Sequence, residues 1–551
     1  MGTLRNSEVM DFTGGINTVV APHLIAKQEA LHLVNVDIDF GSLKSVPNAE
    51  LVQPIAGSHF VEFRGEIYSY NGWRSNTRQD NNLYWSDGTT LGKILWDGRE
   101  LPLGMVTPTT IPTLAAGSAG PHLGDFKYTY TFYSTDTGVE SAPCSLTDYF
   151  TAASTDIVIS GMQTLPPEAD RYRLYRIGGY LPRFTMVAEL EVDTYTDSLD
   201  DTQIDGRLLQ TMRSGLPIQG TTNLTELNGR LFGSVGSKVY FSALGNADAW
   251  YASDFFTLPS DIIGIASSPA GLIILGDQFV YTLAGSNPSN FRLKVVSNHI
   301  GCISAASIAY IKGAAIWLSE TGICLSNGYD VENLTANKIE AIKNRSVTSS
   351  TVINNVYYLH FELSTEYPDN NIVVMDFKRG NKYSFHYLQY ENMDSIGNVS
   401  DVLHLSSGID DLIFLDCDKP LLCSDFLLCS EYSINKIGDG IENKLAKLVY
   451  VSPQFVDGTI GTLKEYDKVR INFRGAFNVK VIFSDLEVAV EANISTIAKT
   501  VVYENIEYTE DRGVIIGIPN NNNTSYSISF VIEGIGSIKS IQYSWKPREL
   551  P

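Results

Sequence analysis

The sequence predicts an all-β fold with three parts: a β-propeller-like domain, an immunoglobulin- or fibronectin-like β-sandwich inserted into it, and a C-terminal β-sandwich. The main observation is a recurring module in which a run of β-branched and aromatic residues ends at an x-Gly turn, at 67–72, 83–88, 239–245, 280–285 and 323–328. Such turns favour antiparallel hairpins, because they need residues that tolerate positive φ. The 551 residues exceed what one hydrophobic core supports. Repeated hairpins over this length are typical of a propeller.

The first hundred residues are expected to lead into the propeller. Within the N-terminal segment, 1–50, the stretch 26–33 has one short helical face, and the residues from Asn35 alternate like a strand that turns at Gly41. The segment 51–106 continues as hairpins and is assigned to the first part of the propeller.

The segment 107–218 is expected to form the inserted sandwich. It opens with a Thr-, Pro- and Ala-rich stretch, 107–120, that has the composition of a linker. Alternation at 126–133 and a short run at 172–175 indicate strands, and the Asp-rich stretch 193–205 ends the domain.

The hairpin modules resume at 219–440, so we predict that 51–105 and 224–430 form one propeller. The last part, 441–551, has longer alternating runs, at 468–473, 479–483, 526–532 and 538–545, with a hairpin tip at 520–523. These runs predict a second sandwich.

The charge excludes several classes of partner. The chain has 62 acidic and 40 basic residues, a formal net charge of −22. Phosphate binding depends on clustered Lys and Arg, so we expect no retention of nucleic acid or anionic membrane. The first eleven residues lack the apolar core of a signal peptide, and the longest apolar stretch, 262–275, is interrupted by Gly, Ser and Pro. A soluble protein made in a reducing cytosol, without a membrane-spanning segment, is expected, and six cysteines fit that compartment.

Two groups of carboxylates could serve a glycosidase, which needs a pair of acids. One is Asp410 and Asp411 with Asp416 and Asp418, and the other is Asp200 and Asp201 with Asp197 and Asp205. Both lie beside turn residues, where Asp bonds its own backbone, so we interpret them as turn residues. The Asp box of sialidases is not matched, because Ser86-Asp87-Gly88 lacks the spacing to Trp96.

Metal and cofactor signatures are weak. Asn35, Asp37 and Asp39 alternate like calcium ligands, but Phe40 stands at the sixth position and Val46 where a bidentate Glu belongs, so a solvated strand edge is preferred. The spacing of Cys417, Cys423 and Cys429 does not fit zinc, and buried thiols are preferred. The eight scattered His residues are interpreted as core or surface histidines. We therefore predict no catalytic, cofactor-binding or metal residues, and no enzyme.

Several segments carry a resemblance to a known family. These are 228–232, 239–242 and 247–250, then 271–275, 280–285, Gly301 with Ser304, and 316–323. Further segments are 14–17, 35–47, 138–143 and 173–176. They resemble the tail tube or nozzle proteins of short-tailed bacteriophages, over most of 11–330.

The resemblance implies a structural subunit in the virion tail, assembled in the host cytoplasm. Such a subunit forms a ring, with a hexamer suggested by the family, and stacks below the portal and adaptor. It lines the channel through which genomic DNA leaves, and tail fibre proteins are possible neighbours. The family has no catalytic residues to carry over.

Two other functions stay open. A glycan-binding or glycan-cleaving propeller would use exposed tryptophans such as Trp73, Trp96 or Trp250 as stacking platforms, although core packing is the preferred interpretation of all three. An intracellular scaffold propeller of no viral origin is the third.

Overall fold

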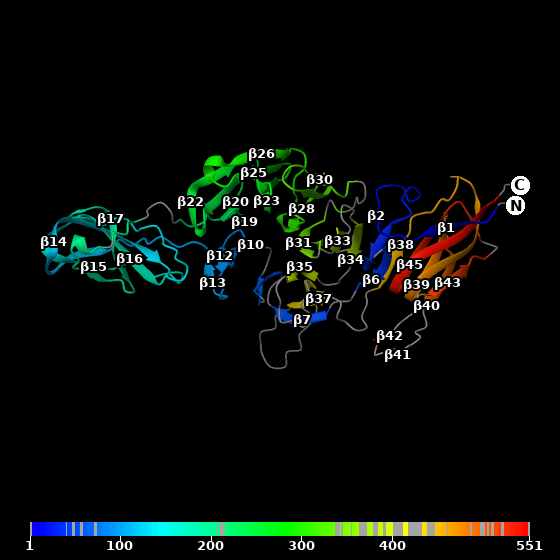
Figure 1. The fold of residues 1–551 in the computed structure, drawn as a ribbon, viewed down its shortest axis with the longest axis horizontal. Helices are drawn as coiled ribbons and strands as arrows, with labels where there is room; N and C mark the ends of the chain where they lie inside the picture. Colours follow the sequence, from blue (N-terminus) through cyan, green and yellow to red (C-terminus); the bar gives the residue numbers. More distant parts are fainter. Residues whose placement is uncertain are drawn as a thin grey trace. The chain divides into compact units, whose positions relative to one another are not determined.

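The computed structural model is built almost entirely of antiparallel β-structure (Figure 1). It describes residues 3–39, 41–46, 50–55, 59–64, 66–70, 74–204, 206–209, 215–336, 342, 345–353, 355–362, 372–377, 384–388, 393–399, 411–416, 432–437, 447–459, 461–484, 488–495, 502–503, 506–507, 512–519 and 523–548. The chain divides into two compact units, one of 1–73 with 302–551 and one of 74–301. The predicted all-β class is confirmed.

The 74–301 unit contains three four-stranded antiparallel sheets in which each strand pairs with the next in sequence. The first has β10 (Ser75–Gln79), β11 (Asn82–Ser86), β12 (Leu91–Ile94) and β13 (Glu100–Pro102). The second has β19 (Thr222–Leu227), β20 (Arg230–Val235), β21 (Lys238–Ala243) and β22 (Asn246–Thr257). The third has β23 (Ile262–Ser268), β24 (Gly271–Gly276), β25 (Val280–Ala284) and β26 (Arg292–Ser297). This order is that of propeller blades.

The first strands of these three sheets lie side by side. The amide of Leu224 in β19 donates to Ser75 Oγ in β10 at 3.1 Å, and Thr225 Oγ1 donates to the Ile265 carbonyl of β23 at 3.0 Å. Between the first two sheets, Lys93 and Asp248 form a buried ion pair at 2.7 Å. The same Asp248 carboxylate accepts the Gly104 amide at 2.8 Å, so the two sheets are held together although the sandwich separates them in sequence.

The unit of 1–73 with 302–551 contains more sheets of the same kind. One is formed by β27 (Ala309–Ile311), β28 (Ala314–Ser319), β29 (Gly322–Ser326) and β30 (Glu332–Asn333). Another set, β31 (Val347–Ile353), β32 (Val356–Phe361), β33 (Ile372–Asp376) and β34 (Ser384–Leu388), also pairs in sequence order, but β34 continues through a parallel pairing with β4 (His32–Val34) into the sheet of the C-terminal strands. A third joins β35 (Met393–Val399), β36 (Asp411–Asp416) and β37 (Tyr432–Ile437) to β7 (Glu50–Ile55). The hairpin β8 (His59–Phe63) and β9 (Glu66–Tyr70) completes the set.

The x-Gly turns behave as the sequence predicts. Gly88, Gly245, Gly285 and Gly328 follow β11, β21, β25 and β29, and all four have positive φ, between 68° and 116°. The fifth turn, at 71–72, lies outside the described residues.

The inserted sandwich is a five-stranded sheet in the order β17-β16-β14-β15-β18. Its strands are β14 (Thr113–Tyr133), β15 (Phe150–Ser160), β16 (Arg171–Gly178), β17 (Leu181–Leu190) and β18 (Tyr195–Asp197). The prediction of a linker at 107–120 is wrong from residue 113 onward, because the small residues there form the first third of β14. The pairing of this part of β14 with β15 is irregular, with register shifts between Ala116 and Leu123. β14 pairs with β15 along its first part and with β16 along its second.

The C-terminal sandwich is built on two long strands that pair along their whole length, β39 (Lys464–Phe483) and β45 (Ile528–Pro547). Further strands flank them: β38 (Leu448–Val451), β40 (Val488–Ser495), β43 (Arg512–Gly517) and β44 (Thr524–Ser525). Separate two-stranded sheets are β2 (Gly15–Ile16) with β3 (Glu29–Ala30), and β41 (Val502–Tyr503) with β42 (Ile506–Glu507).

The β39–β45 ribbon bends where Gly475 faces Gly536. A Cβ on Gly475 would lie 2.1 Å from the Ile535 carbonyl oxygen, and one on Gly536 would lie 2.0 Å from that of Arg474. Ring contacts between the two parts of the ribbon follow the bend: Phe530 lies 5.7 Å from Tyr543, and Tyr466 stacks on Phe483 at 5.6 Å. The glycines therefore let one ribbon form both sides of a core.

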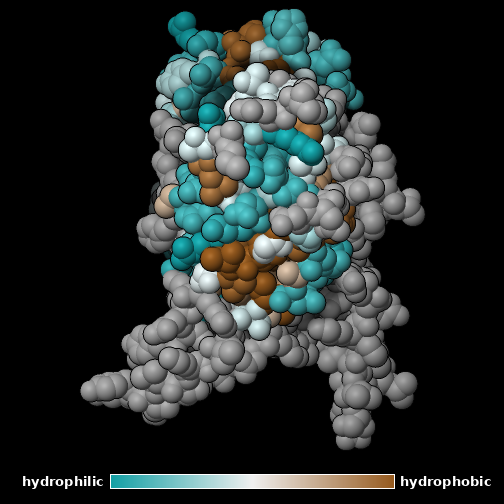
Figure 2. Space-filling model, turned by 90° about the vertical axis from the view of Figure 1, so that its right-hand side faces the viewer, coloured by the Kyte–Doolittle hydropathy of each residue, from teal (hydrophilic) through white to brown (hydrophobic). Residues whose placement is uncertain are grey.

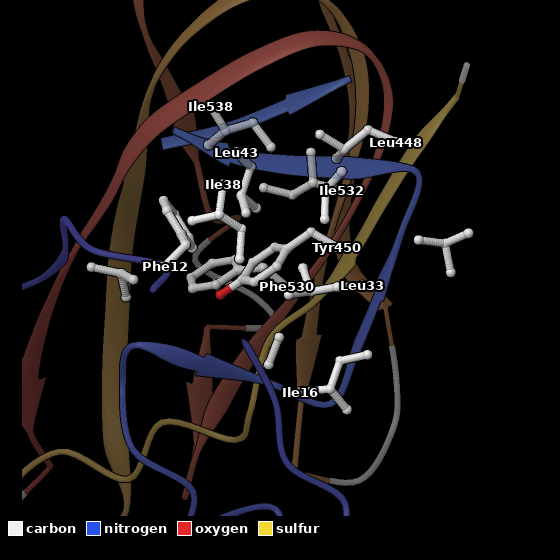
Figure 3. Close-up of a cluster of buried hydrophobic side chains, with 14 of the residues drawn as sticks. Phe12, Ile16, Leu33, Ile38, Leu43, Leu448, Tyr450, Phe530, Ile532 and Ile538 are labelled. Atoms are coloured by element: carbon white, nitrogen blue, oxygen red, sulfur yellow. The ribbon is translucent and has the colours of Figure 1, made fainter. Parts of the chain in front are cut away.

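N-terminal strands complete this sandwich. β1 (Arg5–Val9) and β6 (Ser42–Ser45) pair with β45, β5 (Val36–Asp39) pairs with β6, and β4 (His32–Val34) pairs with β38. Figure 3 shows Phe12, Leu33 and Leu43 against Tyr450, Phe530 and Ile532 in one apolar core. The predicted helical face at 26–33 is wrong: β3 and β4 lie there, because the pairing of β3 with β2 and of β4 with β38 outweighs a weak local preference.

The only helices in the described ranges are the 3-10 turns η1 (Asp201–Gln203), η2 (Pro288–Asn290) and η3 (Ala305–Ser307). None of them has the length and apolar character that a bilayer crossing needs.

Candidate functional site

The Asp-rich segment 193–205 forms a buried polar network in the inserted sandwich. Arg176 of β16 is fully buried, and its guanidinium donates to Asp197 Oδ2 at 2.6 Å and to Asp201 Oδ1. Tyr128 of β14 donates its hydroxyl to the same Asp197 oxygen at 2.7 Å, and His122 Nε2 lies 3.0 Å from the Asp197 carbonyl. One cation is thus shared by two carboxylates in the interior.

The electrostatics of the network favour this ion pair. Burial alone would lower the pKa of Arg176, but Asp197 and the other acidic groups around it outweigh burial and raise it. Burial raises the pKa of Tyr128 far above its usual value, and the Asp197 carboxylate raises it further. Arg176 stays charged and Tyr128 stays protonated at any physiological pH, so both remain donors to Asp197 Oδ2.

Asp200 and Asp201 organise the turn that follows. Asp200 caps η1, since its Oδ1 accepts the Thr202 amide at 3.0 Å while Gln203 Oε1 accepts the Asp200 amide at 2.9 Å. The Thr202 amide and hydroxyl lower the pKa of Asp200. Asp201 Oδ2 accepts the amide of Tyr180 at 2.7 Å. Asp205 lies outside the described residues, so the structure brings together Asp197 and Asp201 through Arg176.

This network supports an exposed surface that the sequence did not single out. Tyr180 stands at the β16–β17 hairpin with 94% of its surface exposed. Leu123 of β14 is 71% exposed, and Tyr149, which precedes β15, is 69% exposed with Lys127 Nζ 4.2 Å from its ring centroid. We call Leu123, Tyr149 and Tyr180 the sandwich tip.

The strand register places the three side chains at one end of the sandwich. Phe126 pairs with Phe150 on one side and with Gly178 on the other. Leu123 lies three residues before Phe126, Tyr149 directly precedes Phe150, and Tyr180 lies two residues after Gly178. The sandwich tip thus presents three exposed apolar or aromatic side chains near one end of the inserted sandwich.

The acid group of Asp410, Asp411, Asp416 and Asp418 is described only in part. Asp411 and Asp416 are the first and last residues of β36, and Asp410 and Asp418 lie outside the described residues.

Among the candidate metal ligands, Asn35 has a structural role. Asn35 is buried, has φ of 53°, and donates its side-chain amide to the Lys447 carbonyl, so the prediction of a solvated strand edge is wrong for it. Cys417, Cys423 and Cys429 lie outside the described residues. Within the ranges that are described, no group of three His, Cys, Asp or Glu residues could hold a metal ion.

The remaining thiols and histidines are mostly in the core. Cys144, Cys302 and Cys324 are buried, and burial raises the pKa of Cys302 to about 12, which removes its thiolate at neutral pH. His122, His360 and His386 are buried, whereas His23 and His299 are exposed and His32 is half-buried. The structure does not describe the side chains of His59 and His404.

The tryptophans separate into core and surface. Trp250 is 1% exposed and donates its indole N–H to the Ala247 carbonyl at 2.8 Å, which confirms the core prediction. Trp96 is 65% exposed in the turn before β13, so the core prediction is wrong there. Trp73 lies outside the described residues.

Comparisons with known proteins give no family. No protein-family model and no curated protein matches the chain. Among solved structures, Sqt1 from Saccharomyces cerevisiae matches 71% of this chain and 98% of its own, at 10% identity and a TM-score of 0.28. The N-terminal domain of Nup159 matches 79% and 100%, at 10% identity and a TM-score of 0.26.

A third similar structure is a glycoside hydrolase family 43 arabinoxylan arabinofuranohydrolase from Bacillus subtilis. It matches 81% of this chain and 96% of its own, at 9% identity and a TM-score of 0.16. At these scores none of the three carries an argument about function.

Proposed function

We propose that this chain is a structural subunit of a bacteriophage tail nozzle or tube. Copies of it form a ring, a hexamer by the family resemblance, that lines the channel for DNA ejection into the host. Its partners are other copies of itself, the portal or adaptor, and tail fibre proteins, and genomic DNA passes through it transiently. Its place is the virion tail, after assembly in the host cytoplasm.

The observation that carries the proposal is how the residues of the resemblance are used. The segments 228–232, 239–242 and 247–250 belong to three consecutive strands of one blade-like sheet. Ser242 Oγ accepts the Leu231 amide at 3.0 Å, and Trp250 closes the apolar core beneath them. Because these residues stabilise a sheet, their resemblance to the tail proteins supports a common structural module rather than a common catalysed reaction.

The charge supports the same function. A conduit must not hold the DNA that moves through it, and an acidic wall repels phosphate. The net charge of −22 is repeated in each subunit of a ring. Residues 441–551 hold 13 of the 62 acidic residues and 12 of the 40 basic ones, so the acidic excess lies almost wholly in residues 1–440.

The alternative is a glycan-binding or glycan-cleaving propeller, and the exposed Trp96 is what favours it, because an exposed indole can stack on a sugar ring. A glycosidase also needs two accessible carboxyl groups. Asp197 is fully buried and pairs with Arg176. Asp201 pairs with Arg176 and accepts the Tyr180 amide. We therefore favour the structural function.

Electron microscopy of the purified protein separates the two. Rings or tubes support the tail subunit, and a monomer that turns over host surface polysaccharide supports the glycosidase. We expect no hydrolysis. Turnover that Asp411→Ala or Asp201→Ala abolishes would contradict this expectation.

A further inference from the structure

The C-terminal sandwich carries a groove of about 370 Å³ on the outer face of its sheet. It is lined by Asn6, Ser7, Glu8, Lys468, Arg470, Ile515, Gln542, Tyr543 and Ser544. The register puts Glu8, Gln542, Arg470 and Ile515 in one row across β1, β45, β39 and β43. Asn6, Ser544 and Lys468 form the next row on the same face.

The groove combines one apolar wall with polar and cationic groups. Ile515 is 60% exposed. Lys468 and Arg470 are exposed and have no ion-pair partner among the described residues. The Arg470 side chain lies over β43 at Gly513, where a Cβ would come within 2.9 Å of its Nε. Two acids stand beside them: Glu8 accepts from Gln542, and Asp467 accepts the Ser544 hydroxyl at 3.4 Å.

Exposed polar and apolar side chains also lie elsewhere on the unit that carries the groove. Figure 2, which turns the right-hand side of Figure 1 toward the viewer, shows hydrophilic surface interrupted by hydrophobic patches. In the unit that carries both termini, exposed apolar side chains include Leu4, Met10, Leu24, Ile515 and Tyr526. A partner of this face therefore needs apolar contact as well as charge.

The sandwich tip has the complementary chemistry. Tyr180 offers an aromatic face for the Arg470 guanidinium and the Ile515 side chain, and a hydroxyl for the amides of Asn6 or Gln542. Exposed carboxylates flank the tip, since Asp125 precedes Phe126 and Asp148 precedes Tyr149. Their sign is opposite to that of Lys468 and Arg470. The Asp201 carboxylate fixes the Tyr180 backbone, so little conformational entropy is lost when the tip binds.

We propose that the sandwich tip of one copy of this chain docks into this groove on a second copy. The tip and the groove are different surfaces, so the contact is head-to-tail, and head-to-tail contacts build rings when their rotation closes. This inference rests on the proposed function, to which it adds the surfaces that join neighbouring subunits.

The test is a charge exchange between the two surfaces. The tip variant carries Asp125→Lys and Asp148→Lys, and the groove variant carries Lys468→Glu and Arg470→Glu. In each variant alone the exchanged residues have the same sign as the charged residues that they would face, so we expect ring assembly to weaken at least tenfold in mass photometry at physiological salt. Mixed one to one, the variants restore both kinds of junction, and alternating rings of wild-type mass return.

Matched controls keep the outcome interpretable. Lys480→Glu with Lys546→Glu reverses two cations of the same long strands outside the groove and leaves the ring intact. Tyr180→Ala weakens assembly at least tenfold, whereas Tyr329→Ala, at a tyrosine that is 66% exposed in another turn, does not. Circular dichroism confirms that each variant is folded.

The two hypotheses fail in different ways. Variants that keep wild-type rings, or a mixture that stays dissociated although both variants are folded, overturn the docking inference and leave the proposed function standing. A wild-type protein that forms no ring overturns the proposed function, and with it this inference.

Discussion

The inserted sandwich and the C-terminal sandwich differ in how their long strands are arranged and in what fills their interiors. Each is built on long strands: β14 passes from β15 to β16 and has register shifts between Ala116 and Leu123, whereas β39 and β45 stay paired throughout and bend together at facing glycines. The inserted sandwich then buries Arg176 with two carboxylates, while the C-terminal one fills its interior with rings such as Phe455, Phe530 and Tyr543.

The buried acidic groups of the two sandwiches position different parts of the chain. In the inserted sandwich the ion network orders the turn that presents Tyr180. In the C-terminal sandwich the buried Asp457 carboxylate accepts from Ser7, Lys27 and Tyr543. It thereby fixes N-terminal residues to the last long strand. Buried charges therefore order an exposed turn in the inserted sandwich and fix N-terminal residues in the C-terminal sandwich. Apolar packing forms the remainder of both cores.

The largest expected effect breaks the network of the inserted sandwich. Arg176→Met leaves Asp197 buried without its cation, which typically costs about 3–5 kcal/mol. Hydrogen exchange should show lost protection in β14, β16 and the 195–204 segment, with β39 and β45 unchanged. The control is Arg171→Met, whose ion pair with Glu191 is exposed and should cost less than about 1 kcal/mol. Equal protection in the two variants would show that the network is not needed.

The second prediction breaks the bend of the C-terminal sandwich. In Gly536→Ala, at φ of 136°, the added Cβ would lie 2.0 Å from the Arg474 carbonyl oxygen, and we expect a loss of about 2–3 kcal/mol. Gly517→Ala is the control, because no atom lies within 4 Å of its added Cβ. Urea unfolding measures both. Equal midpoints in the two variants would mean that the ribbon bends without glycine.

The third prediction concerns a feature that the two sandwiches share. Tyr128 donates to Asp197 and Tyr543 donates to Asp457, and burial, with those carboxylates, raises the pKa of both phenols above the ordinary 10.0. The folded state then holds protons that the unfolded state loses, so their stabilisation is complete below pH 10.0 and falls as pH rises above it.

Urea midpoints between pH 8 and 11 check this sign. The wild-type midpoint should fall above about pH 10, the ordinary pKa of tyrosine. It should fall less steeply in Tyr128→Phe with Tyr543→Phe. A midpoint that rises with pH in this range would contradict the assignment.

The smallest expected effect separates the tryptophans. Trp96→Ala should change stability by no more than about 0.5 kcal/mol, as is usual for a surface substitution. Trp250→Ala should cost about 3–5 kcal/mol because it empties a core position. A large loss in Trp96→Ala would mean that the exposed indole packs in the assembled protein.

Local patterns predicted the hairpins well and the long-range pairings poorly. The x-Gly turns at Gly88 and Gly245 follow from the φ that those turns need. No local signal announces that β1, β4 and β6 join the C-terminal sheet, because such pairing is decided by distant partners. The small residues at 113–120 read as a linker because they pack weakly, although they continue β14.

The acids of the site were singled out in the sequence but interpreted as turn residues, whereas Asp197 lies in a buried ion pair. The acid cluster around Asp197 and Asp201 was found from composition, but its partner Arg176 lies about twenty residues away on another strand, and no spacing rule connects them. Tyr180 follows Gly178 and Gly179, so that pair of glycines was the available signal for a turn with an exposed aromatic residue. Its exposure becomes evident only when the burial of its neighbours is known.

The central claim is that this chain forms a ring around a DNA channel, and electron microscopy of the assembled protein tests it most directly. We predict a closed ring whose channel wall carries more Asp and Glu than Lys and Arg, since phosphates in transit would stall on basic rings. At physiological ionic strength that repulsion reaches about 8–10 Å. A net basic channel, or an assembly without a channel, would contradict the claim.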